Sequence, residues 1–140
     1  MAMAPIAVAS LLSDRGVETI LQITGRDRNK MALQSELLAA SALGVTHVLC
    51  MSGDPPGTGD HPNAKAVFDL DSPGLLKAIT KLKSGTDISG NNLNGSPVLH
   101  AGAVANPGST DLDKEMQRME EKIEAGAKFF QTQAVYNPSD

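Results

Sequence analysis

The sequence predicts an α/β domain whose strands run parallel. Short stretches rich in β-branched or apolar residues are separated by longer stretches with helical periodicity, in the order helix, then strand and helix three times, then strand. Strands that alternate with helices imply right-handed crossovers and a parallel sheet. Each unit takes about 30 to 45 residues, which suits a (β/α) barrel, although a whole barrel needs eight units and about 250 residues. The 140 residues therefore predict one domain, either a small open sheet or part of a barrel.

Two of the expected strands lie in the first third of the chain. Residues 6–12 form an apolar helical stretch, and residues 19–24 are rich in β-branched side chains, as in a strand. Asn29 is well placed to cap a helix over residues 31–43, and a second apolar strand over 46–50 follows it. The helical side chains expected to face the core are Met31, Leu33, Leu37, Leu38 and Ala42.

A third helix and a third strand are expected in the middle of the chain. Ser72 is predicted to cap the helix and Pro73 to occupy its first turn. Residues 84–96 are rich in Gly, Asn and Ser, which predicts a surface connection, and residues 97–104 predict a strand. The apolar face of the helix is expected to consist of Leu75, Leu76, Ile79 and Leu82.

The last helix and strand follow a break at Asn106-Pro107-Gly108. Thr110 with Asp113 three residues later resembles a capping box in which Asp replaces Glu, so a helix is expected to run to about residue 124. Residues 129–135 predict the final strand. The side chains expected to face the core from this helix are Leu112, Met116, Met119 and Ile123.

Charge and composition limit the classes of partner. The net charge of −4 argues against nucleic acid or an anionic membrane surface as a partner. The sequence contains only three Phe and one Tyr, too few for a base-stacking platform. No stretch is long and apolar enough to span a membrane, and the first residues lack the basic region of a signal peptide. These observations predict a cytoplasmic protein.

The cysteine and histidine content gives no reason to expect a metal. Cys50 is the only cysteine, so the chain has no internal disulfide and no cysteine cluster for zinc, and its apolar surroundings predict a small buried hydrophobic side chain. His47, His61 and His100 lack the spacing of metal ligands. We therefore expect no metal site.

The most distinctive stretch is the turn that follows the second strand. The apolar run ends in Ser52-Gly53-Asp54-Pro55-Pro56, and neither proline has the N–H group that a paired strand requires. The chain is therefore expected to leave the sheet at Asp54, which puts a carboxylate at the carboxyl end of a strand. In α/β folds this edge carries the ligands and the chemistry. The alternative is an ordinary turn, because Asp and Pro are common turn residues.

Five short motifs fall in one order along the chain: TGRDRN at 24–29, SGDPP at 52–56, NP at 106–107, KIEAGA at 122–127 and TQ at 132–133. Together they resemble the methylenetetrahydrofolate reductase family, most closely the bacterial form fused to a homocysteine S-methyltransferase. The resemblance covers nearly the whole chain and rests on the five motifs in register, because each alone is common. It implies a (β/α)8 barrel of which this chain, a partial TIM barrel, matches about the third to the sixth strand.

The resemblance also implies an activity. Members of this family pass a hydride from NAD(P)H through FAD to 5,10-methylenetetrahydrofolate and release 5-methyltetrahydrofolate. FAD is thus the implied cofactor, NAD(P)H the implied electron donor and a folate the implied substrate. The family is an oxidoreductase of one-carbon metabolism that serves methionine biosynthesis. Protein groups near such a cofactor ring tune its electronics, while the cofactor itself carries out the redox step.

The resemblance assigns the main role to Asp54, which matches a family aspartate near the flavin and the pterin ring of folate. Its implied work is electrostatic, and it is the one catalytic residue expected within this chain. Ser52 and Gly53 match flavin-contacting backbone, although many members have Arg at the position of Ser52. Gln22 matches a flavin-binding His, and its side chain is also suited to an ordinary strand position.

The remaining implied contacts come from other strand ends. Asn106 matches a further family His, and Thr24 lies at a strand end where it would line the cofactor site. Lys122 matches a lysine that reaches the FAD phosphates, where a diphosphate requires a cation, although a lysine near a helix C-terminus is also favoured by the helix dipole. Gln133 matches the glutamine that holds folate. Phe68 lies near a family Tyr at the cofactor, and the alternative for it is a core position.

One part of the family's machinery falls outside this chain in the same register. The family's general acid, a glutamate near the start of the barrel, would lie before Met1, so protonation linked to opening of the folate ring lacks its donor here. The first hypothesis is therefore a reductase segment that a second copy, a partner chain or a longer protein completes. The alternatives are a non-catalytic barrel relic that serves as a binding or scaffold protein, and an unrelated small α/β enzyme. The last lacks any glycine-rich nucleotide motif to support it.

Overall fold

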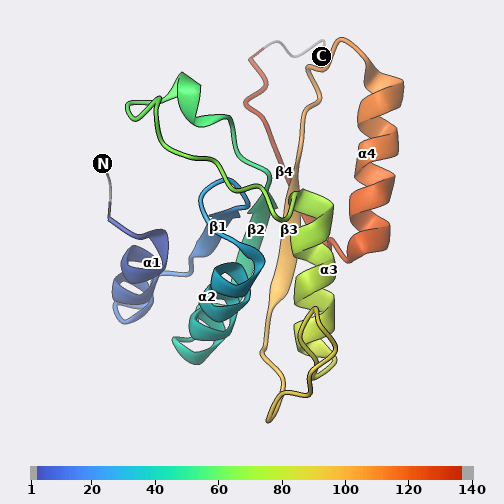
Figure 1. The fold of residues 1–140 in the computed structure, drawn as a ribbon. Helices are drawn as coiled ribbons and strands as arrows, with labels where there is room; N and C mark the ends of the chain where they lie inside the picture. The colour runs from blue at the N-terminus through green and yellow to red at the C-terminus, as the bar shows by residue number, and fades with distance from the viewer. Residues whose placement is uncertain (1–2, 137–140) are drawn as a thin grey trace.

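The computed structural model describes residues 3–136 and contains one sheet of four parallel strands (Figure 1). The strands are β1 (Ile20–Thr24), β2 (His47–Met51), β3 (His100–Ala105) and β4 (Phe129–Thr132). The helices are α1 (Pro5–Ser13), α2 (Lys30–Ala42), α3 (Ser72–Lys83) and α4 (Leu112–Ala125), with a short 3-10 turn η1 (Pro56–Thr58). These elements follow the predicted order, and β4 ends earlier than expected.

The strand order β1-β2-β3-β4 identifies the way in which the sheet is wound. Each strand pairs in parallel with the next one along the chain, and a helix connects each pair. A doubly wound sheet would reverse its order at a switch point, whereas successive pairing in one direction is the winding of a (β/α) barrel. The prediction of an α/β fold with parallel units in a partial barrel is therefore confirmed.

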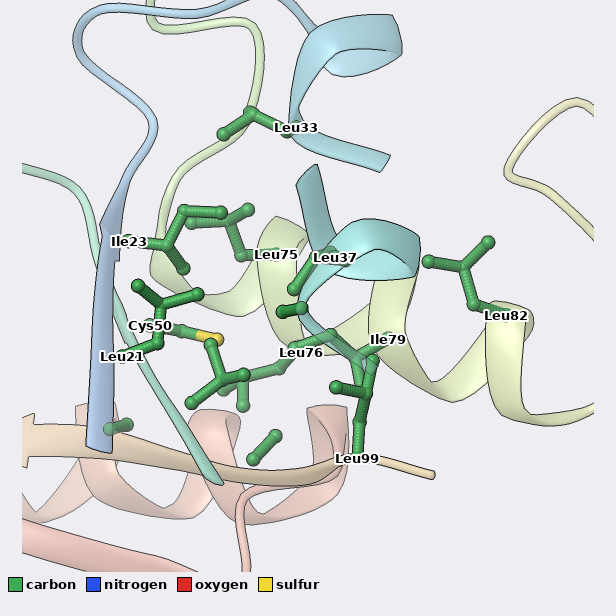
Figure 2. Close-up of a cluster of buried hydrophobic side chains, with 14 of the residues drawn as sticks. Leu21, Ile23, Leu33, Leu37, Cys50, Leu75, Leu76, Ile79, Leu82 and Leu99 are labelled. Atoms are coloured by element: carbon green, nitrogen blue, oxygen red, sulfur yellow. The ribbon is translucent and has the colours of Figure 1, made fainter. Parts of the chain in front are cut away.

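The hydrophobic core lies between the sheet and the helices (Figure 2). One face of each strand supplies it, because alternate residues of a strand point to the same side of the sheet. The strand residues of this face are Leu21, Ile23, Val48, Cys50, Ala101 and Ala103. The opposing helical residues are Leu33, Leu37, Ala40, Leu75, Leu76, Ile79 and Leu82.

The expected helical faces were right for α3 and wrong in part for α2. All four predicted α3 side chains are buried. On α2 the buried residues are Leu33, Leu37 and Ala40, while Met31, Leu38 and Ala42 are exposed. Because a helix turns 100° per residue, the buried set at i, i+4 and i+7 defines a narrower face than the apolar residues alone suggest.

The prediction for α4 was wrong. Leu112, Met116 and Ile123 are more than half exposed, and Met119 is only partly covered. The helix packs on α3 through its C-terminal end, where Ala125 is buried. The apolar residues of α4 therefore form a stripe on its outer side that no other described element covers.

Two of the three expected helix caps belong to a neighbouring residue. Asn29 caps α2 as predicted, because its side chain accepts from the backbone N–H groups of residues 31 and 32. Asp71 rather than Ser72 caps α3, and Asp111 rather than Thr110 caps α4. An ionised carboxylate at a helix N-terminus also interacts favourably with the helix dipole, which explains the preference.

The second face of the sheet carries no helix in the described part of the chain. Ile20, His47 and His100 are exposed on this face, and the two imidazole rings stack with their centroids 5.0 Å apart. The ring of Phe129 lies against Gly102 of β3, where any side chain would overlap it. In a closed barrel this face is the interior, so we call it the inner face. No described helix is long and apolar enough to cross a membrane.

Candidate functional site

A cavity of about 630 Å³ opens at the carboxyl ends of β2 and β3, beside α3 and α4. In Figure 1 this is the end of the sheet from which the long loop after β2 and the first turns of α4 project. The predicted residues that line it are Ser52, Gly53, Asp54, Lys122 and Gln133. The other lining residues are Cys50, Met51, Asp71, Ser72, Pro73, Val104, Glu115, Arg118 and Glu121. The structure thus brings together five of the nine predicted site residues.

The turn after β2 determines the position of Asp54. Gly53 has φ +89°, a left-handed conformation that favours glycine, and a side chain there would press on Thr24 and Arg26. The Arg26 guanidinium donates to the backbone carbonyl of Asp54 at 3.3 Å. The carboxylate of Asp54 is itself left accessible, because Arg26 is tied by a 2.7 Å ion pair to Asp27. The hydrogen bond that Arg26 donates to the Asp27 carboxylate lowers the pKa of Asp27.

Lys122 reaches the cavity from α4. Its ammonium donates to the backbone carbonyl of Val104 at 2.7 Å, next to the end of β3. An ammonium carries three donor hydrogens, so two remain for a ligand. Gln133, one residue beyond β4, is held by a backbone hydrogen bond to the carbonyl of Ala105 at 2.9 Å. The backbone of Gln133 and the ammonium of Lys122 are therefore both fixed against the end of β3.

Sequence reasoning missed Glu115, the most deeply buried charged residue in the described part of the chain. Its carboxylate accepts from the backbone N–H of Asn106 at 2.9 Å and lies 3.7 Å from the guanidinium of Arg118. This contact closes the β3–α4 loop onto α4. No sequence signal identifies it, because Glu115 stands among charged neighbours on a helix that is mostly exposed.

The first turn of α3 forms the opposite wall. The hydroxyl of Ser72 donates to the carbonyl of Cys50 at 2.8 Å, and the backbone N–H of Ser72 donates to the hydroxyl of Ser52 at 3.2 Å. These bonds join α3 to the end of β2. Cys50 is buried as predicted, and its burial raises the pKa of the thiol to about 12, so the thiol is protonated and not a nucleophile.

Four predicted residues lie outside the cavity lining. Thr24 lies next to Gly53 of the lining, where a side chain added to Gly53 would press on it. Gln22 is exposed on the inner face and is not among the residues that line the cavity. Phe68 lies in the loop before α3 with φ +50°, and its ring is 41% exposed rather than part of the core. Asn106 reaches the site only through its backbone bond to Glu115.

The loop that carries Phe68 is fastened to the end of β1. The N–H of Phe68 donates to the carbonyl of Gly25 at 3.1 Å, and the N–H of Val67 donates to the carbonyl of Arg26 at 2.8 Å. The carbonyl of Leu70 occupies the place where a side chain of Gly25 would stand. Only glycine permits this approach, and it holds Phe68 in a conformation that non-glycine residues rarely adopt.

The cavity lining is more acidic than basic. Carboxylates come from Asp54, Asp71, Glu115 and Glu121, and cations come from Arg118 and Lys122. An excess of acceptors suits a ring with several N–H donors, as in an aminopyrimidine. An anionic group such as a diphosphate could bind the two cations of α4. Each cation already has one partner in the chain: Arg118 lies beside the Glu115 carboxylate, and Lys122 donates to the Val104 carbonyl. The residues present therefore fit both kinds of group.

Comparison with known proteins identifies a family. No curated protein matches the chain. A family model described as methylenetetrahydrofolate reductase matches residues 1–140, which is the whole chain.

Proposed function

Because the chain belongs to the methylenetetrahydrofolate reductase family, we propose that it is a segment of a flavin-dependent reductase that acts on 5,10-methylenetetrahydrofolate. The observation that carries this proposal is the cavity at the carboxyl edge, where Asp54, Lys122 and Gln133 line one space. FAD is the proposed cofactor, NAD(P)H the proposed electron donor and the cytoplasm the proposed compartment. The fusion to a homocysteine S-methyltransferase stays a prediction.

The pterin ring of the folate is assigned to Asp54 and Gln133. A carboxylate accepts from the ring N–H and amino groups, while an amide both donates and accepts. Asp54 fits this role because Arg26 binds only its backbone carbonyl and leaves its side chain accessible. Its negative charge would also stabilise the cationic iminium that opening of the folate ring produces and that hydride transfer then neutralises.

The flavin is assigned to the backbone of Ser52 and Gly53 and to Lys122. Lys122 would offer its two remaining donors to the diphosphate. Bound FAD would supply the hydride that reduces the folate. Thr24, Gln22, Asn106 and Phe68 are proposed as secondary contacts of the flavin, with the exposed Phe68 ring available for stacking.

The alternative is a non-catalytic member of the family that keeps the sheet and serves as a binding or scaffold protein. The cavity lining favours it, because four carboxylates and only two cations line the space and a diphosphate would meet more like than opposite charge. Flavin binding separates the two proposals, since only a reductase segment needs to bind FAD.

The experiment is a titration of the purified chain with FAD, followed by quenching of flavin fluorescence, and a parallel calorimetric titration with 5-methyltetrahydrofolate. We expect both ligands to bind. Lys122→Met should weaken FAD about 10- to 100-fold, as for one lost charge-assisted hydrogen bond. Asp54→Asn should weaken the folate and leave FAD little changed.

Two matched substitutions serve as controls. Lys128→Met and Asp14→Asn remove the same charges at exposed positions outside the cavity lining, and both should leave the affinities unchanged. Failure of the unaltered chain to bind either ligand would support the scaffold alternative. Binding that Lys122→Met and Lys128→Met weaken equally would show that the cavity is not the flavin site.

A further inference from the structure

The sheet ends in two different free edges. Within the described residues β1 pairs only with β2, and β4 pairs only with β3. The outer side of each strand therefore presents backbone N–H and C=O groups that another parallel strand could pair with. Proteins normally cover or charge such edges, because they attract other chains. Neither Ile20–Thr24 nor Phe129–Thr132 contains a charged residue or a proline.

The two outermost helices carry matching apolar stripes. On α1 the stripe consists of Val8, Leu11 and Leu12, which are 38–50% exposed, and the helix PIAVASLLS contains no charge. On α4 the stripe consists of Leu112, Met116 and Ile123, which are 54–58% exposed. Spacings of three, four and seven residues put each set on one helical face. Figure 1 shows the two helices at opposite ends of the row.

We propose that these edges and stripes form one interaction surface whose occupant is a second copy of this chain. Because all four strands are parallel, a two-fold axis along the barrel axis pairs β4 of each copy with β1 of the other. Both junctions form at once, and eight parallel strands close into a barrel. In each copy α1 precedes β1, so it covers the new junction and lies beside α4 of the other copy. The two apolar stripes then face each other.

The exposed area agrees with this arrangement. The accessible surface of the chain is 8779 Å², whereas surface scaling gives about 6,900 Å² for a compact monomer of this mass. The projecting loop after β2 contributes to this excess, as do the exposed apolar residues of α1 and α4. A standard interface buries about 800 Å² on each partner, so the excess of roughly 1,900 Å² is enough for a stable one.

The inner face supplies a further argument. Met51 of β2 and Phe129 of β4 are partly exposed on the side of the sheet that carries no described helix. Side chains on this side fill the interior when a barrel closes, so closure would bury them. The proposal depends on these surfaces alone and not on flavin binding, so a negative ligand titration leaves it unaffected.

The test begins with the mass of the purified chain in solution, measured by sedimentation velocity over a hundredfold range of concentration. We expect a single species of twice the 14.6 kDa chain mass. A monomer throughout the range would overturn the proposal. A mass that continues to rise with concentration would overturn it as well, because an open array does not close.

Two single substitutions then test the pairing of α1 with α4. Leu11→Glu and Met116→Lys each put an unpaired charge into both junctions, and each should yield a monomer. An equimolar mixture should recover the dimer, because one junction then pairs the new carboxylate with the new ammonium and the other junction is unaltered. This recovery requires that α1 of one copy meet α4 of the other.

The matched controls are Leu43→Glu and Val98→Lys, which change exposed apolar residues away from both stripes. They should remain dimers, and circular dichroism should show the same helix content in all four variants. Dimers of Leu11→Glu or Met116→Lys alone would overturn the proposal. Monomers that fail to recombine in the mixture would overturn it too, since some other surface would then hold the copies together.

Discussion

The contact between Gly25 and the loop before α3 predicts a specific effect of Gly25→Ala. A methyl group at Gly25 would overlap the backbone carbonyl of Leu70, and a backbone segment cannot yield as a flexible side chain does. The loop must therefore move away from the end of β1. We expect this movement to release the loop that carries Phe68 and to loosen the contact of Leu70 with the core.

The magnitude follows from the bonds that the movement breaks. The N–H groups of Val67 and Phe68 lose the carbonyls of Arg26 and Gly25, and the N–H of Lys30 loses the carboxylate of Asp69 at 3.1 Å. Three such bonds contribute about 1.5 to 4.5 kcal/mol together. Replacement of glycine by alanine restores about 0.4 to 1 kcal/mol by stiffening the unfolded chain. The net loss is therefore about 0.5 to 4 kcal/mol, with a midpoint of about 2.3 kcal/mol.

The assay is native-state hydrogen exchange of the amides of Val67 and Phe68, combined with urea unfolding. Exchange at these amides should accelerate roughly 50-fold, as a local loss of about 2.3 kcal/mol requires. The control is Gly57→Ala in the same loop, where a methyl group meets nothing within 4 Å and which should change neither measurement. Equal exchange in Gly25→Ala and the unaltered chain would refute the reasoning, because the loop would then tolerate the displacement.

Two further predictions concern the end of β2. Ser72→Ala removes the hydroxyl that donates to the buried carbonyl of Cys50, so the free energy of unfolding measured in urea should fall by about 1 to 2 kcal/mol. The control Ser84→Ala removes an exposed hydroxyl and should lower it by less than about 0.5 kcal/mol. Equal losses in the two variants would contradict this assignment. Burial raises the pKa of the Cys50 thiol from 9.0 to about 12, so the folded chain keeps a proton that the unfolded chain releases above pH 9. The stability that the thiol contributes is therefore complete below pH 9 and decreases by about 1.4 kcal/mol per pH unit between 9 and 12. Urea unfolding at about pH 8 and pH 10.5 would measure this. The free energy of unfolding should fall more between these pH values for the unaltered chain than for Cys50→Ala.

The order of elements could be predicted from local signals. Residues 19–24 and 46–50 contain β-branched and apolar side chains bounded by turn residues, and both are strands. The place of Asp54 followed from two prolines that cannot donate to a sheet, and the carboxylate does lie at the strand end. These features depend only on residues close in sequence, so one chain without relatives is enough to identify them.

The errors come from contacts between distant segments. The apolar stripe of α4 is visible in the sequence, but the sequence does not say which neighbour covers it, and in this chain no described element does. Glu115 is buried because α4 lies over the backbone of Asn106, a contact that helical periodicity does not encode. The left-handed Phe68 likewise depends on Gly25, which is more than 40 positions away in sequence.

The position of the core has a consequence for the ancestry of such barrels. Because the largest buried side chains gather between sheet and helices, most of the contacts that hold these four strands are internal to this stretch of chain. A gene for such a stretch can encode a product that folds before any duplication, fusion or partner completes the ring. The barrel interior, where ligands approach, is then the layer assembled last and the layer most free to diverge.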